Sequence, residues 1–192
     1  MRHVISALVM NEPGVLANVA GMFAARGFNI DSLVVGRTEN PELSRMTIVV
    51  TADDNTLEQV RKQLAKLVPV VKVRDFKDAA YIERDLALIT VGAGPEHRSE
   101  VIEIANLFRG KVVDVGKASL MIELAGTEEK IEAFIELMKP FGIKELARTG
   151  VIAMARGAQQ TKDDAAAANG TADGGKRKRS LDAPPAAALP PS

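Results

Sequence analysis

The sequence predicts an α+β protein built from two tandem ferredoxin-like βαββαβ domains and a disordered C-terminal tail. Short apolar runs typical of strands alternate with helical i, i+3, i+4 patterns, and the resulting order is β-α-β-β-α-β. The same order returns, less clearly, in the second half of the chain. A segment rich in Ala, Gly and Pro follows it. We therefore predict domains at 1–77 and 84–158, a linker at 78–83 and a tail at 159–192.

The first unit begins with an apolar run at 4–9, which is suited to a strand. The turn formers Asn11, Pro13 and Gly14 end this strand. The helix that follows presents one apolar face, made of Leu16, Val19, Ala20, Phe23 and Ala24. Gly27 is expected to end the helix, because glycine is favoured just beyond a helix C-terminus.

Two strands, a second helix and a last strand complete the first unit. We expect the strands to run from Ile30 to Val35 and from Met46 to Val50, with apolar and polar residues alternating in the second of them. The second helix is expected to be capped within 53–55. Its apolar face consists of Leu57, Val60, Leu64 and Leu67. A proline ends this helix, and the fourth strand begins at Val71.

The second unit repeats the order of the first. Its expected elements are strands at 86–91, 112–115 and 120–124, helices at 101–108 and 127–139, and a last extended segment at 143–154. Units of about 75–80 residues are small for independent stability. Each also leaves sheet edges that must be covered. Both facts favour oligomerisation.

The segment 159–192 has only two large apolar residues, Leu181 and Leu189, and no aromatic residue. Such a composition cannot bury enough surface to offset the entropy of ordering, so we predict a disordered tail. A basic run at 176–179 lies within it. This run could touch nucleic acid or act as a localisation signal, and a solubilising patch is the simpler interpretation.

Composition and charge exclude several classes of function. The formal net charge is +0, from 25 basic and 25 acidic side chains, so no overall field gathers phosphates. We therefore expect neither nucleic acid nor a membrane surface as a partner. The chain contains no Cys, which excludes disulfides and thiolate sites and makes a cytoplasmic location the simpler interpretation. No apolar stretch approaches the roughly 18 residues of a membrane span.

The sequence offers little for catalysis. The two histidines, His3 and His97, lack the spacing of a metal site, and no serine stands in a nucleophile-elbow motif. The acidic pairs at 53–54 and 128–129 lie at expected helix starts, where they suit the positive end of the helix dipole. We therefore predict no catalytic residues and no metal site.

The loop from Asn11 to Gly14 joins the first strand directly to the first helix. Gly14 allows a close approach of the backbone to a ligand. The N–H groups of Val15 and Leu16 would then point outward at the positive helix end, an arrangement that suits a carboxylate. From the loop alone, a plain turn punctuated by Pro and Gly is an equal alternative.

Several sequence blocks resemble a known family. Three blocks in the first unit, NEPGVL at 11–16, RGFNIDSL at 26–33 and LSRMTI at 43–48, resemble an ACT domain. More narrowly, they resemble the small, regulatory subunit of acetohydroxyacid synthase (acetolactate synthase). Blocks in the second unit, at 83–86, 108–115, 123–127 and 147–151, are similar to the C-terminal domain of that family. The resemblance covers about residues 1–158, and the tail has no counterpart.

The resemblance implies a protein without an active site or a bound cofactor of its own. Members of the family bind a catalytic large subunit, which uses thiamine diphosphate, Mg²⁺ and FAD to condense pyruvate with a second 2-keto acid. They raise its activity in valine, leucine and isoleucine biosynthesis, and they confer feedback inhibition by a branched-chain amino acid, usually valine. Two alternatives remain: a stand-alone amino-acid sensor that acts on another target, and a small ferredoxin-like enzyme.

The resemblance also places the effector between the ACT domains of a homodimer. One subunit would contribute Asn11 and the backbone at Gly14, Val15 and Leu16, and the other would contribute Asn29 and Ile30. An Asn side chain can accept from an ammonium and donate to a carboxylate. Apolar strand residues such as Ile30 or Val35 would hold the aliphatic side chain. Alternatively, Asn29 only shapes its turn, and Ile30 and Val35 only belong to the core.

Overall fold

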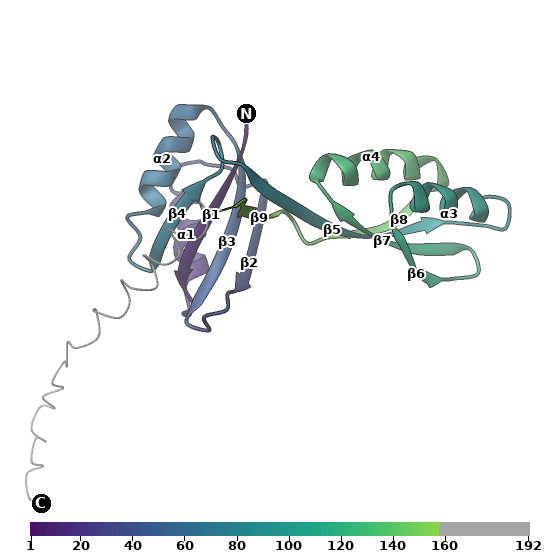
Figure 1. Ribbon diagram of the computed structural model, residues 1–192, viewed down its shortest axis with the longest axis horizontal. Helices are drawn as coiled ribbons and strands as arrows, with labels where there is room; N and C mark the ends of the chain where they lie inside the picture. Colours follow the sequence, from purple (N-terminus) through teal and green to yellow (C-terminus); the bar gives the residue numbers. More distant parts are fainter. Residues whose placement is uncertain (158–192) are drawn as a thin grey trace, which may run out of the picture.

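The computed structural model of this 192-residue chain describes residues 1–157 (Figure 1). The tail expected at 159–192, with its basic run, lies outside the described residues, as does residue 158. Two lobes lie side by side, and a long strand runs from one into the other (Figure 1). Each lobe has the predicted βαββαβ order, which confirms the α+β prediction.

The N-terminal lobe is a four-stranded antiparallel sheet in the order β2-β3-β1-β4, with two helices on one face. Its elements are β1 (Arg2–Met10), α1 (Val15–Ala24), β2 (Ser32–Arg37), β3 (Leu43–Thr51), α2 (Asp54–Leu64) and β4 (Val70–Asp75). The core lies between sheet and helices, because alternate residues of β1 and β3 pack against the buried faces of α1 and α2. This leaves the other face of the sheet without helices.

Helix α1 buries a different stripe from the one predicted. Val15, Val19, Met22 and Phe23 are buried, whereas Leu16, which we placed on the apolar face, is 46% exposed. The helix is apolar nearly all round, so its periodicity does not fix which side faces the sheet. Strand β2 also begins at Ser32, two residues later than the predicted strand that starts at Ile30.

The C-terminal lobe repeats the architecture with the sheet order β6-β7-β5-β8. Its elements are β5 (Tyr81–Gly92), α3 (Arg98–Leu107), β6 (Lys111–Val115), β7 (Ser119–Gly126), α4 (Glu128–Met138), the 3₁₀ turn η1 (Lys139–Phe141), β8 (Ile143–Arg148) and β9 (Ile152–Ala155). A second core fills the space between this sheet and the helices α3 and α4. No helix within residues 1–157 is long and apolar enough to cross a membrane.

The chain passes between the lobes twice. The first part of β5, residues 81–84, pairs with β9, and the remainder pairs with β7 and β8. The predicted linker at 78–83 thus includes the first three residues of a strand. The extended segment predicted at 143–154 is interrupted between β8 and β9. Beyond this interruption, β9 returns to the helix-free face of the N-terminal sheet, where its buried residues form a third apolar cluster with residues of β1, β3 and Phe76.

Candidate functional site

The loop between β1 and α1 leaves the helix N-terminus open. Gly14 occupies the N-cap position with φ 85° and ψ −12°, a left-handed conformation that glycine adopts without strain. It supplies no side-chain cap, and the first turn of α1 contains no acidic residue. The first N–H groups of a helix have no intrahelical acceptor, and here that of Val15 donates to the carbonyl of Glu12 in the loop at 3.4 Å. A Cβ on Gly14 would meet no atom within 4 Å.

Asn11 links this loop to the connection between β2 and β3. Its Nδ2 donates to the carbonyl of Pro41 (2.9 Å), and its Oδ1 accepts from the hydroxyl of Ser44 (3.1 Å). The backbone N–H of Asn11 donates to the carbonyl of Glu42 at 2.7 Å. A primary amide has a second N–H and a second lone pair. The exposed Asn11 side chain can therefore brace the loop and still offer both functions to a ligand. The sequence did not identify Ser44 as its partner.

Val35 lies near the middle of edge strand β2, level with Ala7 of β1 and three residues short of Met10. It stands opposite Met46 on β3, so its side chain is on the face that carries the helices, and it is 43% exposed. Strand β2 forms the edge of the sheet. Val35 and Leu16 thus both leave apolar surface exposed, and their part in binding an effector stays a prediction.

Asn29 and Ile30 lie at the opposite end of the sheet. They precede β2, whose first residue stands beside Val49 and thus near Val4, whereas Asn11 directly follows Met10. Val4 and Met10 are six residues apart on β1, which corresponds to roughly 20 Å along a strand. Asn29 is exposed and donates through Nδ2 to Asp31 Oδ1 (3.1 Å), and Ile30 is partly buried against the core. One chain therefore holds the two predicted parts of the site far apart.

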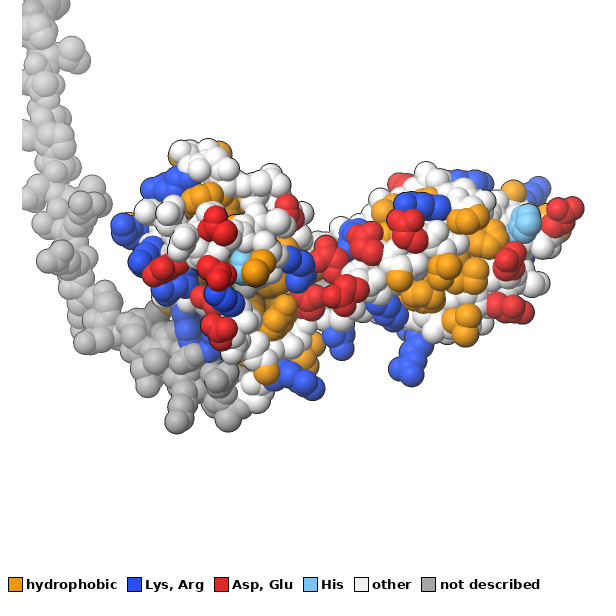
Figure 2. Space-filling model, turned by 90° about the horizontal axis from the view of Figure 1, so that it is seen from above, with side chains coloured by type: hydrophobic (Ala, Val, Ile, Leu, Met, Phe, Trp, Pro, Cys, Tyr) orange, Lys and Arg blue, Asp and Glu red, His pale blue; other side chains and the backbone are white. Residues whose placement is uncertain are grey.

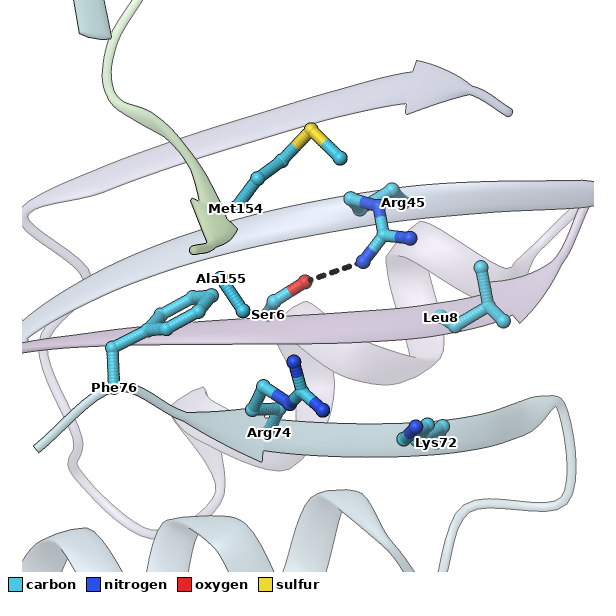
Figure 3. A pocket seen from close by; sticks show the side chains of 8 residues that line it. All are labelled: Ser6, Leu8, Arg45, Lys72, Arg74, Phe76, Met154 and Ala155. Carbon is cyan, nitrogen blue, oxygen red and sulfur yellow. Dashed lines mark hydrogen bonds between the residues drawn. The ribbon is translucent and has the colours of Figure 1, made fainter. Parts of the chain in front are cut away.

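A small basic hollow occupies the helix-free face of the N-terminal sheet (Figure 3). The side chains of Arg45, Lys72 and Arg74 converge there from β3 and β4, and Arg45 Nη1 donates to Ser6 Oγ at 3.2 Å. Met154 of β9 borders the hollow from above the sheet (Figure 3). None of the predicted site residues lines it. Within residues 1–157, no cluster of three or more His, Asp or Glu residues could hold a metal ion.

Charged side chains gather where the two lobes meet (Figure 2). Arg2 forms ion pairs with Glu83 (3.0 Å) and Glu128 (2.6 Å), and Arg148 pairs with Asp85 (2.5 Å) and with Glu132. Partial burial disfavours the charged form of Arg148, but its hydrogen bonds to the two carboxylates outweigh this and raise its pKa above the ordinary value. The sequence did not identify this junction, because it joins residues that are distant along the chain.

Comparisons with known proteins divide the chain where the structure does. The family model described as "AHAS small subunit-like ACT domain" matches residues 5–72, and "Small subunit of acetolactate synthase" matches residues 84–157. The "Probable acetolactate synthase small subunit" of Archaeoglobus fulgidus is 56% identical over 157 residues, which cover 82% of this chain and 98% of that protein. The acetolactate synthase small subunit of Mycolicibacterium smegmatis is 50% identical over 155 residues, covering 81% and 91%.

A solved structure gives the same result. The crystal structure of the acetolactate synthase small subunit from Thermotoga maritima superimposes with a TM-score of 0.75 and 45% sequence identity, and covers 82% of this chain and 98% of that one. Sequence and fold therefore agree over both lobes, which confirms the resemblance found in the sequence blocks. The chain belongs to the family of acetolactate synthase small subunits, which are non-catalytic regulatory subunits with an N-terminal ACT domain.

Proposed function

We propose that this chain activates the catalytic large subunit of acetolactate synthase and makes it sensitive to inhibition by a branched-chain amino acid, with valine as the preferred effector. The observation that carries the proposal is the corner formed by Asn11 and Gly14. There a helix start with no side-chain cap and no acidic residue in its first turn follows the anchored amide of Asn11, and Leu16 is half-exposed.

Each part of an amino-acid effector has a matching group at this corner. The effector carboxylate would accept from N–H groups in the first turn of α1, at the positive end of the helix. Its ammonium would donate to the amide oxygen of Asn11, which can accept a second hydrogen bond. The aliphatic side chain would cover Leu16 and Val35, whose present exposure leaves apolar surface in water.

A homodimer would complete the pocket. Asn29 and Ile30 lie roughly 20 Å from Asn11 along the strands, at the other end of β2. A two-fold axis that sets β2 antiparallel to its copy would bring the Asn11 end of one sheet next to the Asn29 and Ile30 end of the partner's sheet. Edge strand β2 has an outer side that such pairing would cover. We therefore propose a dimer formed through the ACT domains, with two equivalent effector sites.

The catalytic large subunit, and not this chain, would carry out the reaction. In this proposal thiamine diphosphate, Mg²⁺ and FAD would bind to the catalytic large subunit in the cytoplasm, and this chain would contribute control alone. Feedback control of this kind needs a coupling free energy of only about 1–3 kcal/mol between effector binding and the active state of the partner. A pocket shared by two subunits supports this role, because occupancy favours one relative orientation of the subunits over others.

Calorimetric titration of the full chain with valine, leucine and isoleucine tests the proposal. We expect saturable binding of two ligands per dimer, with valine strongest, and a dimer in sedimentation experiments. The same chain, mixed with its catalytic subunit, should raise acetolactate formation and make it sensitive to the ligand that binds. A chain that binds none of the three amino acids, or that leaves the catalytic subunit unaffected, would contradict the proposal.

A further inference from the structure

The short connection between β8 and β9 contacts both lobes through successive backbone groups. The N–H of Gly150 donates to Asp85 Oδ1 at 3.1 Å, and the N–H of Val151 donates to Ser32 Oγ at 3.3 Å. Asp85 belongs to the part of β5 that lies in the C-terminal sheet, and Ser32 is the first residue of β2. Adjacent peptide groups thus hold one residue from each lobe.

The approach of this connection to β2 depends on the absence of a side chain at position 150. Gly150 has φ +85°, and a Cβ there would lie 2.6 Å from Ser32 Oγ and 2.9 Å from Val34 Cγ2. Real Cβ atoms essentially never come that close to another atom. A side chain at position 150 would therefore force the side chains of Ser32 and Val34 to move, or push the connection away from β2.

The Asp85 side of this contact, in the C-terminal lobe, is rigidly held. The carboxylate of Asp85 is fully buried, and it accepts from Arg148 Nε (2.8 Å), Arg148 Nη2 (2.5 Å) and Thr149 Oγ1 (3.3 Å) in addition to Gly150. Arg148 also pairs with Glu132 on α4. A buried carboxylate with this many donors has little freedom to move, because each lost bond leaves a desolvated charge less well compensated. A displacement of Gly150 would thus be passed on to β5 and α4.

The Ser32 side of this contact, in the N-terminal lobe, lies close in sequence to residues of the proposed effector site. Ser32 follows Asn29 and Ile30 by three and two residues, and β2 also carries Val35. Beyond Val151, strand β9 lies across the helix-free face of the sheet, where Ala155 stands near Ser6 and Phe76 (Figure 3). The start of β2 therefore cannot shift without changing the contact with the returning chain.

We propose that the series of contacts from Ser32 through Val151 and Gly150 to Asp85 transmits effector occupancy from the ACT domain to the C-terminal domain. This relay rests on the function proposed above and names the residues that couple binding to control. A ligand shifts an equilibrium only through contacts that differ between two states. Effector contacts at Asn29 and Ile30 would set the position of β2, and Gly150 would convert that position into the orientation of the C-terminal lobe. In this scheme Ser32, Gly150 and Asp85 are positioning residues and contact no effector.

Gly150→Ala tests the relay in the full chain reconstituted with its catalytic subunit, and Gly142→Ala is the matched control. Gly142 has nearly the same φ, +82°, but a Cβ there meets no atom within 4 Å. We expect Gly150→Ala to bind valine within about threefold of the unmodified chain and to activate the catalytic subunit, while the valine concentration for half-inhibition rises at least tenfold. Couplings between allosteric sites typically change affinity by about 5–150-fold. Gly142→Ala should keep binding, activation and inhibition.

Three outcomes would overturn the relay. Normal inhibition in Gly150→Ala would show that the contact carries no signal. Joint loss of valine binding and inhibition would place position 150 in the effector site. Failure of the unmodified chain to bind any branched-chain amino acid would remove the proposed function and the relay with it.

Ser32→Ala gives an independent test if Gly150→Ala does not fold. This change removes the acceptor of the Val151 N–H and leaves the backbone of β2 intact. We expect a weaker effect in the same direction, with half-inhibition shifted about three- to tenfold and valine binding retained. Ser99→Ala, at an exposed serine of α3, is the control. Equal inhibition curves for the two serine variants would overturn the relay.

Discussion

The corner at which the first strand leads into the first helix is built differently in the two domains. In the ACT domain, Gly14 caps α1 without a side chain, and no acidic residue follows in the first turn. In the C-terminal domain, His97 occupies the same position before α3, and Glu100 stands in the first turn. The imidazole and the carboxylate approach each other to 3.6 Å. The first turn of α1 therefore contains no anion, whereas the first turn of α3 already contains the carboxylate of Glu100.

The neighbouring loop shows the same contrast. Asn11 braces the ACT corner with two neutral hydrogen bonds and keeps further hydrogen-bonding capacity. Arg98 fills the C-terminal corner, where its Nη2 lies 3.2 Å from the carbonyl of Ala93, 2.7 Å from that of Gly116 and 2.8 Å from that of Lys117. The fold is repeated, but a neutral amide occupies the corner in one copy and an arginine that reaches three carbonyl groups occupies it in the other. A βαββαβ architecture therefore does not by itself supply an effector site.

The largest expected effect comes from an aspartate at the cap of each first helix. Gly14→Asp should raise the valine concentration for half-inhibition more than about tenfold, equivalent to about 1.4 kcal/mol, because its carboxylate repels that of the effector. His97→Asp, the matched change in the second domain, should leave inhibition unaltered. Activation of the catalytic subunit should persist in both variants. Inhibition curves of the reconstituted enzyme measure the difference.

The variant Gly14→Asn distinguishes the effect of a negative charge at position 14 from the effect of an added side chain. Asn and Asp both tolerate positive φ better than most residues, so the two variants carry similar backbone strain. The neutral amide should therefore reduce sensitivity less than the carboxylate does. Full valine sensitivity in Gly14→Asp, or an equal loss in His97→Asp, would remove the distinction between the corners of the two domains.

A smaller effect, on stability, is expected when the brace of each corner is removed. Arg98→Ala should lower the free energy of unfolding by about 2–3 kcal/mol, because hydrogen bonds of a charged donor are worth about 1.5–3 kcal/mol. Asn11→Ala should cost only about 1 kcal/mol, a value typical of neutral hydrogen bonds. Urea unfolding followed by circular dichroism measures both changes. A larger loss for Asn11→Ala than for Arg98→Ala would reverse the proposed roles of the two corners.

The order of strands and helices was predictable because it depends on local patterns. Turn residues such as Pro13 and Gly14 and the apolar spacing along the helices are visible in the sequence, and the structure confirms the βαββαβ order twice. The buried face of α1 was not predictable, since Val15 and Leu16 are both apolar and the packing of the sheet decides between them.

Long-range features were hidden for a different reason. Gly150 falls within the extended segment predicted at 143–154, but its contact with Ser32 joins residues 118 positions apart. The same holds for the predicted site, because the family resemblance names Asn11 and Asn29, while the strand register places them at opposite ends of the sheet. The family resemblance therefore proposes which residues form a site, and the sheet determines which of them one chain brings together.

The smallest expected effect distinguishes the second helices of the two domains. Asp53 caps α2 by accepting from the N–H of Thr56 at 2.7 Å, and Thr127 caps α4 by accepting from the N–H of Lys130 at 3.4 Å. The hydrogen bonds from the Thr56 backbone lower the pKa of Asp53 below its ordinary value of 3.8. A carboxylate with a lowered pKa stabilises the folded state above its unfolded pKa, and the contribution is lost as the pH falls through the folded value. The hydroxyl of Thr127 has no such dependence.

Melting temperatures of Asp53→Asn and Thr127→Ala from pH 7 to pH 2.5 test this difference. Asn can cap without titrating, so Asp53→Asn should gain stability relative to the unmodified chain once the pH falls below about 3.8, the ordinary pKa of an aspartate. Thr127→Ala should be less stable by a constant amount, about 1 kcal/mol for a lost cap, over the same range. All other carboxylates titrate in every variant, so the differences isolate the two caps. A constant difference for Asp53→Asn would mean that the carboxylate adds nothing to the cap that an amide does not, and the two domains would then be alike at their second helices.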